Sequence, residues 1–124
     1  MAGIDHALLA EGVAHINARF GLAYDIEKLE RLLDAGVLFM LTHPTHPAFS
    51  LMGEYKPLSG GRYLHIYIQY SRTPDRGVQH WLLNVTLAWA KEGGYDSIRF
   101  ESPRKGWQRV FKNAEIGRVY EIGV

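Results

Sequence analysis

The chain contains no cysteine among its 124 residues, so disulfides and thiolate zinc sites are excluded. No apolar run approaches the roughly 20 residues that a membrane helix needs. The first residues lack the basic region and long apolar core of a signal peptide. Neither sign of charge is in clear excess, because Lys and Arg number 14 and Asp and Glu number 13, which gives a net charge of +1. No overall field therefore favours nucleic acid or a membrane, and we expect a soluble domain, intracellular or associated with a particle.

The composition that is present suits one globular domain spanning residues 1–124. Hydrophobic residues make up 47% of the chain, which is enough for one core, and charged residues make up 22%. Disorder is therefore not expected. The chain shows no internal repeat and no low-complexity segment.

Two amphipathic helices are predicted at the start of the chain. The first has apolar residues at helical spacing, namely Leu9, Val13, Ile16 and Phe20. Gly21 is placed to end this helix. Asp25 is placed to begin the second helix by accepting from a free backbone amide, and Gly36 is placed to end it.

The hydrophobic pattern then changes to that of strands. Segments 37–41, 49–55 and 63–70 are predicted strands, separated by loops that contain Pro and Gly. A buried helix begins near Val78 and ends at Gly93-Gly94, and a short strand follows at 97–101. A helical face from Trp107 to Ala114 and a strand over 118–124 complete the chain.

Alternation in segment 63–70 predicts two different faces. The apolar set on one face is Leu64, Ile66, Ile68 and Tyr70, and the amphipathic set on the other is Tyr63, His65, Tyr67 and Gln69. We expect the apolar set to meet helices and the amphipathic set to line a cleft.

The resulting order is α-α-β-β-β-α-β-α-β. Segments 49–55 and 63–70 should form an antiparallel hairpin, while the strand-helix alternation in the second half implies locally parallel strands. We expect an α/β fold with a mixed, mostly antiparallel sheet and helices on both faces.

This order, with the sequence HIYIQYSRTPDRG at 65–77 and WAKEGGY at 89–95, resembles the GNAT superfamily of acyl-CoA N-acyltransferases. The family has a central strand, a Pro-containing turn and an Arg-Gly loop at this place. The resemblance covers about residues 5–124, although the family's usual first strand is missing or reduced. The ending, GWQRVFK at 106–112 and RVYE at 118–121, is similar to small GNAT-like proteins encoded by bacteriophages.

The resemblance implies a CoA-binding loop at Arg76, Gly77, Val78, Gln79 and His80. In the family, backbone amides at this helix start hold the CoA pyrophosphate, and small residues let phosphate oxygens approach. Here Gln79 and Trp81 stand where small residues are needed. Two interpretations follow: a weakened CoA site with Arg76 and His80 as phosphate partners, or an ordinary strand-to-helix turn with Trp81 in the core. The second is favoured.

The catalytic positions that the resemblance implies are also altered. Many family members protonate the leaving thiolate with a Tyr in the last helix, where this chain has Phe111, which has no hydroxyl and cannot donate a proton. Glu54, His65 and Tyr67 are the remaining candidates for a catalytic role. The alternative is that His65 and Tyr67 are cross-strand packing and hydrogen-bonding residues.

Other signals favour neither a metal nor a nucleic acid. His43 and His46 could begin a metal site, but no third ligand stands at a diagnostic spacing, so a solvated loop is favoured and no metal is expected. A basic set could meet phosphates or an acidic protein, although the solvent face of a helix explains it better at this net charge; it comprises Arg104, Lys105, Arg109 and Lys112.

Two functional hypotheses result. The first is a GNAT-like domain with a degenerate acyl-CoA site, which uses no cofactor and acts as a non-catalytic binding or structural protein, plausibly in a phage particle. A protein partner or a second copy would then bind it, since mixed sheets have exposed edges. The alternative is an active N-acetyltransferase that uses acetyl-CoA, with Arg76 and loop amides on the pyrophosphate and His65 or Glu54 as base.

Overall fold

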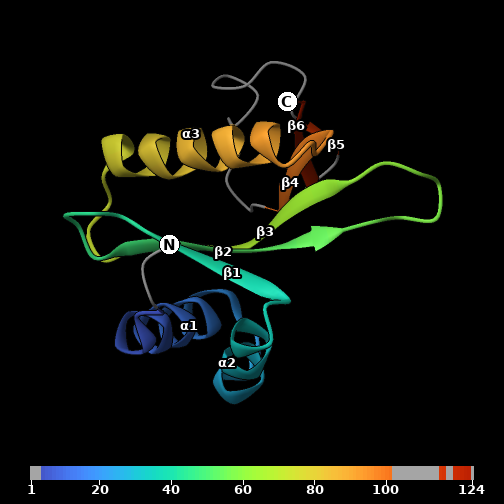
Figure 1. Cartoon of the computed structure of the whole chain (residues 1–124). Helices are drawn as coiled ribbons and strands as arrows, with labels where there is room; N and C mark the ends of the chain where they lie inside the picture. The colour runs from blue at the N-terminus through green and yellow to red at the C-terminus, as the bar shows by residue number, and fades with distance from the viewer. Residues whose placement is uncertain (1–3, 102–114, 117–118, 124) are drawn as a thin grey trace.

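The computed structural model describes residues 4–101, 115–116 and 119–123, and its elements follow the expected order (Figure 1). The elements are α1 (His6–Phe20), α2 (Ile26–Asp34), β1 (Leu38–Thr42), β2 (Ala48–Tyr55), β3 (Tyr63–Ser71), α3 (Arg76–Glu92), β4 (Ser97–Glu101), β5 (Glu115–Ile116) and β6 (Val119–Gly123). The helix predicted at 107–114, with Phe111 and the basic set, lies outside the described residues. The two-residue strand β5 was not predicted.

Short polar side chains and glycines set the bounds of the first two helices; Asp25, Gly21 and Gly36 were predicted from the sequence, whereas the cap at Asp5 was not. The Asp5 and Asp25 carboxylates each accept a backbone N–H from the first turn that follows them. Such a cap satisfies a donor that has no partner within the helix. Gly21 ends α1 in the left-handed region at φ 63°, and Gly36, at φ 75°, follows α2. A side chain at either glycine would be strained.

The sheet is mixed and mostly antiparallel, with the strand order β1-β2-β3-β4-β6-β5. The β1–β2, β2–β3, β4–β6 and β5–β6 pairs are antiparallel, and β3–β4 is parallel. The predicted hairpin and the predicted parallel pair are thus both confirmed. Helices α1 and α2 lie on one face of the sheet and α3 on the other (Figure 1).

The expected faces of β3 are wrong in one respect, because the strand contains a β-bulge. Leu51 pairs with Ile68 but the next residue, Met52, pairs with Ile66, so Tyr67 is an extra residue in β3. An extra residue interrupts the alternation of side chains. Leu64 and Ile66 therefore face α3, whereas Ile68 and Tyr70 face α1 and α2, and the four do not share one face.

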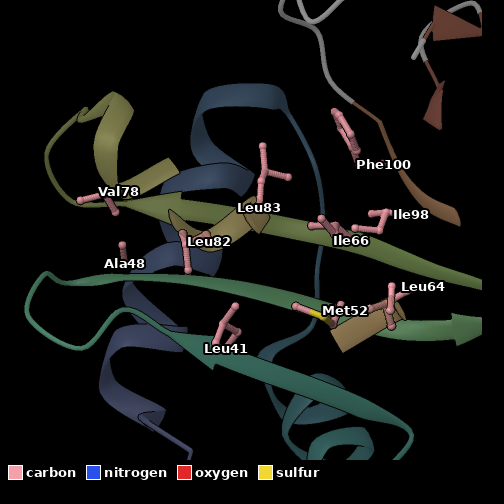
Figure 2. Close-up of a cluster of buried hydrophobic side chains, with 11 residues drawn as sticks. Leu41, Ala48, Met52, Leu64, Ile66, Val78, Leu82, Leu83, Ile98 and Phe100 are labelled. Atoms are coloured by element: carbon pink, nitrogen blue, oxygen red, sulfur yellow. The ribbon is translucent and has the colours of Figure 1, made fainter. Parts of the chain in front are cut away.

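Two hydrophobic clusters, one on each face, hold the layers together. The cluster under α3 is shown in Figure 2 and includes Leu64, Ile66, Leu82, Leu83 and Ile98. The cluster under α1 and α2 has Leu9, Phe49, Leu51 and Ile68 at its centre, each at most 2% exposed. Strands β2 and β3 contribute to both clusters, so they form the shared middle layer. Within the described residues, no helix is long and apolar enough to cross a membrane.

Gly12 marks the closest approach of α1 to the sheet. A Cβ atom at this position would lie 2.5 Å from Cε1 and 2.6 Å from Cζ of Phe49, and 3.0 Å from Cδ2 of Tyr70. Phe49 is fully buried, so its ring has little room to move.

We predict that Gly12→Ala destabilises the protein by about 1–3 kcal/mol, because overpacking outweighs the gain in helix propensity of roughly 1 kcal/mol. Urea unfolding measures the change. Ala10→Ser, on the exposed side of α1, is the control and should change stability by less than about 0.5 kcal/mol. A more stable Gly12→Ala variant would contradict this packing.

Candidate functional site

The start of α3 is occupied by a side chain of the protein itself. Asp75 is the N-cap, and its Oδ1 accepts the N–H of Val78 at 3.2 Å. The same carboxylate oxygen lies 3.1 Å from where a Cβ of Gly77 would be. The Asp75 backbone oxygen accepts the N–H of Gln79 at 3.1 Å. A negative charge therefore already lies at the positive end of the helix dipole.

The five predicted CoA-loop residues form the first turn of α3 but do not act as a set. Arg76, Gly77 and His80 are exposed, Gln79 is half-buried, and Val78 is buried in the cluster under α3. Of these five residues, Val78 therefore packs into the core, whereas Arg76, Gly77 and His80 are exposed to solvent.

Trp81 packs against other side chains of the protein. It is half-buried against the cluster under α3, and its ring lies 4.7 Å from the ring of His43, in the β1–β2 loop. The packing interpretation of Trp81 is therefore correct.

Next to this helix start, β3 extends beyond its parallel partner. The β3–β4 pairing covers only Tyr63 to Ile66, opposite Ser97 to Phe100. The rest of β3, from the bulge at Tyr67 to Ser71, has no strand partner on the β4 side within the described residues. This half-strand leads directly into the turn before α3.

Two of the catalytic candidates lie on the opposite face of the sheet from α3. The rings of His65 and Tyr67 are 4.6 Å apart in an edge-on arrangement. Gly53 is the cross-strand partner of His65, and a Cβ there would lie 3.3 Å from Cε2 of Tyr67 and 2.9 Å from Cδ2 of Leu38. Leu38 belongs to the cluster under α1 and α2, which fixes the face. Tyr67 is 43% exposed, so this pair is accessible to solvent.

The third candidate, Glu54, lies elsewhere, close to the C-terminal end of α3. Its Oε1 accepts from Nε of Arg62 at 3.1 Å and lies 3.2 Å from Nζ of Lys56, and its Oε2 accepts from the Tyr95 hydroxyl at 3.1 Å. The hydrogen bond from Arg62, followed by that from Lys56, lowers the pKa of Glu54 to about 2. A carboxylate with such a low pKa is a weak base near neutral pH.

Arg62 makes this cluster a structural clamp. Besides Glu54, it donates from Nη1 to the Gly93 carbonyl at 2.9 Å, and its guanidinium lies 4.3 Å from the Tyr95 ring centre. Its backbone N–H donates to Asp96 at 2.8 Å. The clamp joins the β2–β3 hairpin to the end of α3, so Glu54 is better explained by structure than by catalysis.

The two histidines of the His43–His46 loop take part in hydrogen bonds within the loop. The two rings are edge-on at 4.9 Å, but Nδ1 of His43 accepts the backbone N–H groups of Thr45 and His46 at 3.2 Å each. That nitrogen is therefore unavailable to a metal. Among the described residues, no three potential ligands are grouped closely enough to hold an ion.

A second ion-pair cluster, which the sequence did not reveal, lies beside a cavity of about 410 Å³ between α1 and the β1–β2 loop. Glu11 accepts two bonds from Arg72, at 2.7 and 3.0 Å, and one from the Tyr70 hydroxyl at 2.7 Å. These bonds, first that from Arg72 and then that from Tyr70, lower the pKa of Glu11 to about 2. Glu11 and Arg72 are 61 positions apart, so no local pattern could have paired them.

The comparisons with known proteins support the fold. One solved structure, described as the crystal structure of a probable acetyltransferase, matches with a TM-score of 0.67 over 93% of this chain and 86% of that chain. The sequence identity is 18%, so the likeness concerns the fold. No model of a known protein family and no curated protein matches the sequence. The chain therefore shares the fold of a probable acetyltransferase, which agrees with the fold that the sequence resemblance implied.

The Glu54 clamp predicts a pH dependence in the acid range. An unfolded carboxyl titrates near 4.5 and the folded one near 2, so the carboxylate contributes stability above pH 4.5 that is lost as the pH falls toward 2. In Glu54→Gln, we expect the free energy of unfolding to change less between about pH 6 and pH 3 than in the wild type. Solvent screening keeps this difference below about 1 kcal/mol.

Urea unfolding at the two pH values measures the effect. Glu27→Gln, at an exposed position on α2, is the control for the loss of one carboxylate. Equal pH dependence in Glu54→Gln and the wild type would contradict the clamp.

Proposed function

We propose that this chain is a GNAT-like domain whose acyl-CoA site is degenerate and that it acts by binding another protein rather than by acyl transfer. The observation that carries the proposal is the position of the Asp75 carboxylate, which caps α3 where a diphosphate would bind. It accepts a hydrogen bond from the backbone N–H of Val78, one of the groups that a phosphate would bind, and its negative charge repels a phosphate oxygen.

The distribution of the catalytic candidates supports the same proposal. Glu54 is held by Arg62 and Lys56 near the far end of α3, whereas His65 and Tyr67 lie on the face of the sheet opposite that helix. Glu54 therefore does not lie with His65 and Tyr67 at one point. Groups that exchange protons with the same reacting atom must lie together, because a proton moves only over hydrogen-bonding distance. The location that we propose, in a bacteriophage particle, is supported by the resemblance at 106–112 and 118–121 alone.

One observation favours the alternative, an active N-acetyltransferase. The half-strand from Tyr67 to Ser71 lacks a partner on the β4 side within the described part of the chain. Amide groups of an acyl-CoA could pair with this strand edge, as peptides do with exposed edges. In that case acetyl-CoA would be the cofactor, and His65 with Tyr67 would face the acceptor from the other side of the sheet.

Calorimetric titration with acetyl-CoA separates the two functions. We expect a dissociation constant weaker than about 0.1 mM, which corresponds to a binding free energy of about −5.5 kcal/mol. Tighter binding, together with acetyl transfer to an amine acceptor, would establish the enzyme instead.

The role of Asp75 itself is tested by Asp75→Asn, which keeps the helix cap but removes the charge. We expect this variant to bind acetyl-CoA about tenfold more tightly than the wild type, because one repulsive charge is lost from the phosphate position. Asp25→Asn, at the cap of α2, is the matched control and should leave the affinity unchanged. Identical affinities in Asp75→Asn and the wild type would show that Asp75 does not obstruct the site.

A further inference from the structure

Strand β1 lies at the edge of the sheet but has the composition of an interior strand. It pairs only with β2 within the described residues, and it ends the strand order. Its sequence, Leu-Phe-Met-Leu-Thr, contains no charge and no proline. Leu38, Met40 and Leu41 are each at most 7% exposed, so both faces of the strand are covered. Natural edge strands are usually protected by charged residues, proline or bulges, and β1 has none of these.

The hydrogen-bond pattern shows which groups of β1 point outward. The His43 N–H donates to the Ala48 carbonyl at 2.9 Å, so this pair is of the hydrogen-bonded type. Such pairs alternate with non-bonded ones along an antiparallel ladder, and the β1–β2 register runs without a shift. Leu38, Met40 and Thr42 therefore direct their N–H and C=O groups away from β2, toward the free edge.

On the far side of β2 the pattern agrees. Arg72 donates its N–H to the Pro47 carbonyl at 3.0 Å, so Pro47 faces β3. Phe49, Leu51 and Gly53 share that parity and pair with β3, which leaves the alternate residues of β2 to bond with β1. The outward direction of Met40 thus follows from two independent bonds.

We propose that β1 is the site where a second copy of this chain binds, by antiparallel pairing of the two β1 strands into one continuous sheet. Pairing of this kind is self-complementary, because a two-fold axis at Met40 places Leu38 of one copy opposite the partner's Thr42. All outward groups of the strand then meet outward groups of the other copy. No second type of surface is needed, which is why a second copy fits better than an unrelated protein.

The residues that flank β1 are compatible with this dimer. Val37 directly precedes the strand and is 55% exposed, and His43 follows it. In the symmetric register, Val37 of one copy approaches the partner's His43 at each end of the pair. Exposed apolar surface next to the strand would therefore be covered by the same contact. This inference does not depend on whether the domain binds acyl-CoA.

Sedimentation velocity over a range of about 1 to 100 µM protein tests the oligomeric state, and a dimer is expected within it. Amide hydrogen exchange of the wild-type protein tests the surface. We expect the Met40 amide to be protected at high concentration and to exchange faster on dilution. The amides of Phe39 and Leu41, which bond to β2, should remain protected throughout.

Thr42→Pro removes one outward N–H at the end of the strand and leaves the bonds to β2 in place. We expect it to weaken the dimer by about tenfold or more, since each copy loses a bond of the interface. Thr42→Val keeps the amide and is the matched control, with dimerisation unchanged.

A protein that is monomeric over the whole range, with a Met40 amide that exchanges rapidly at every concentration, would overturn the proposal. A dimer in which the Met40 amide stays unprotected would also overturn it, because the contact would then lie elsewhere. These measurements on the wild-type chain decide the matter even if Thr42→Pro does not fold.

Discussion

The extra residue in β3 is the constraint on which the arrangement of this domain depends. Before Tyr67 the apolar side chains of β3 face α3, and after it they face α1 and α2. A strand without this bulge would bury one face and leave the other helix layer without an apolar surface on β3. The ladder with β4 also ends at Ile66, the residue before the bulge. One inserted residue therefore allows β3 to contribute apolar side chains to both hydrophobic clusters. The part of β3 after it is not paired with β4 and leads to the start of α3.

Helix α3 is held at both ends by polar contacts, and these contacts bear on function. Asp75 caps its first turn. At its last turn, Arg62 donates hydrogen bonds to Glu54 and to the Gly93 carbonyl. Asp75 directly precedes the predicted CoA loop, and Glu54 is one of the predicted catalytic candidates. Their structural roles support the proposal that the domain is a binding module, and β1 is the surface through which we propose that copies of it associate. A fold shared with a probable acetyltransferase does not contradict this, since function depends on the site rather than the fold.

Much of the fold was predictable because local signals specify it. The cap at Asp25 and the glycines at 21 and 36 act on the nearest turn, and such effects can be read from a few consecutive residues. The candidate site was less predictable. Glu54 meets Tyr95, and Glu11 meets Arg72, over 41 and 61 positions, so their low pKa values arise from contacts that no spacing encodes. The bulge escaped prediction because an alternating pattern continues through it unchanged, and only the partner strand reveals the extra residue.

The sequence by itself determined the element order, the helix caps, the hairpin and the mixed sheet, because propensity and hydrophobic period act over short distances. The tertiary structure alone decided which face each half of β3 presents, where Trp81 packs, which carboxylates are held by cations, and that β1 is left at an edge. Each of these depends on which distant segments become neighbours. Which segments become neighbours depends on how side chains pack on both faces of the sheet at once, and local sequence patterns do not specify this packing.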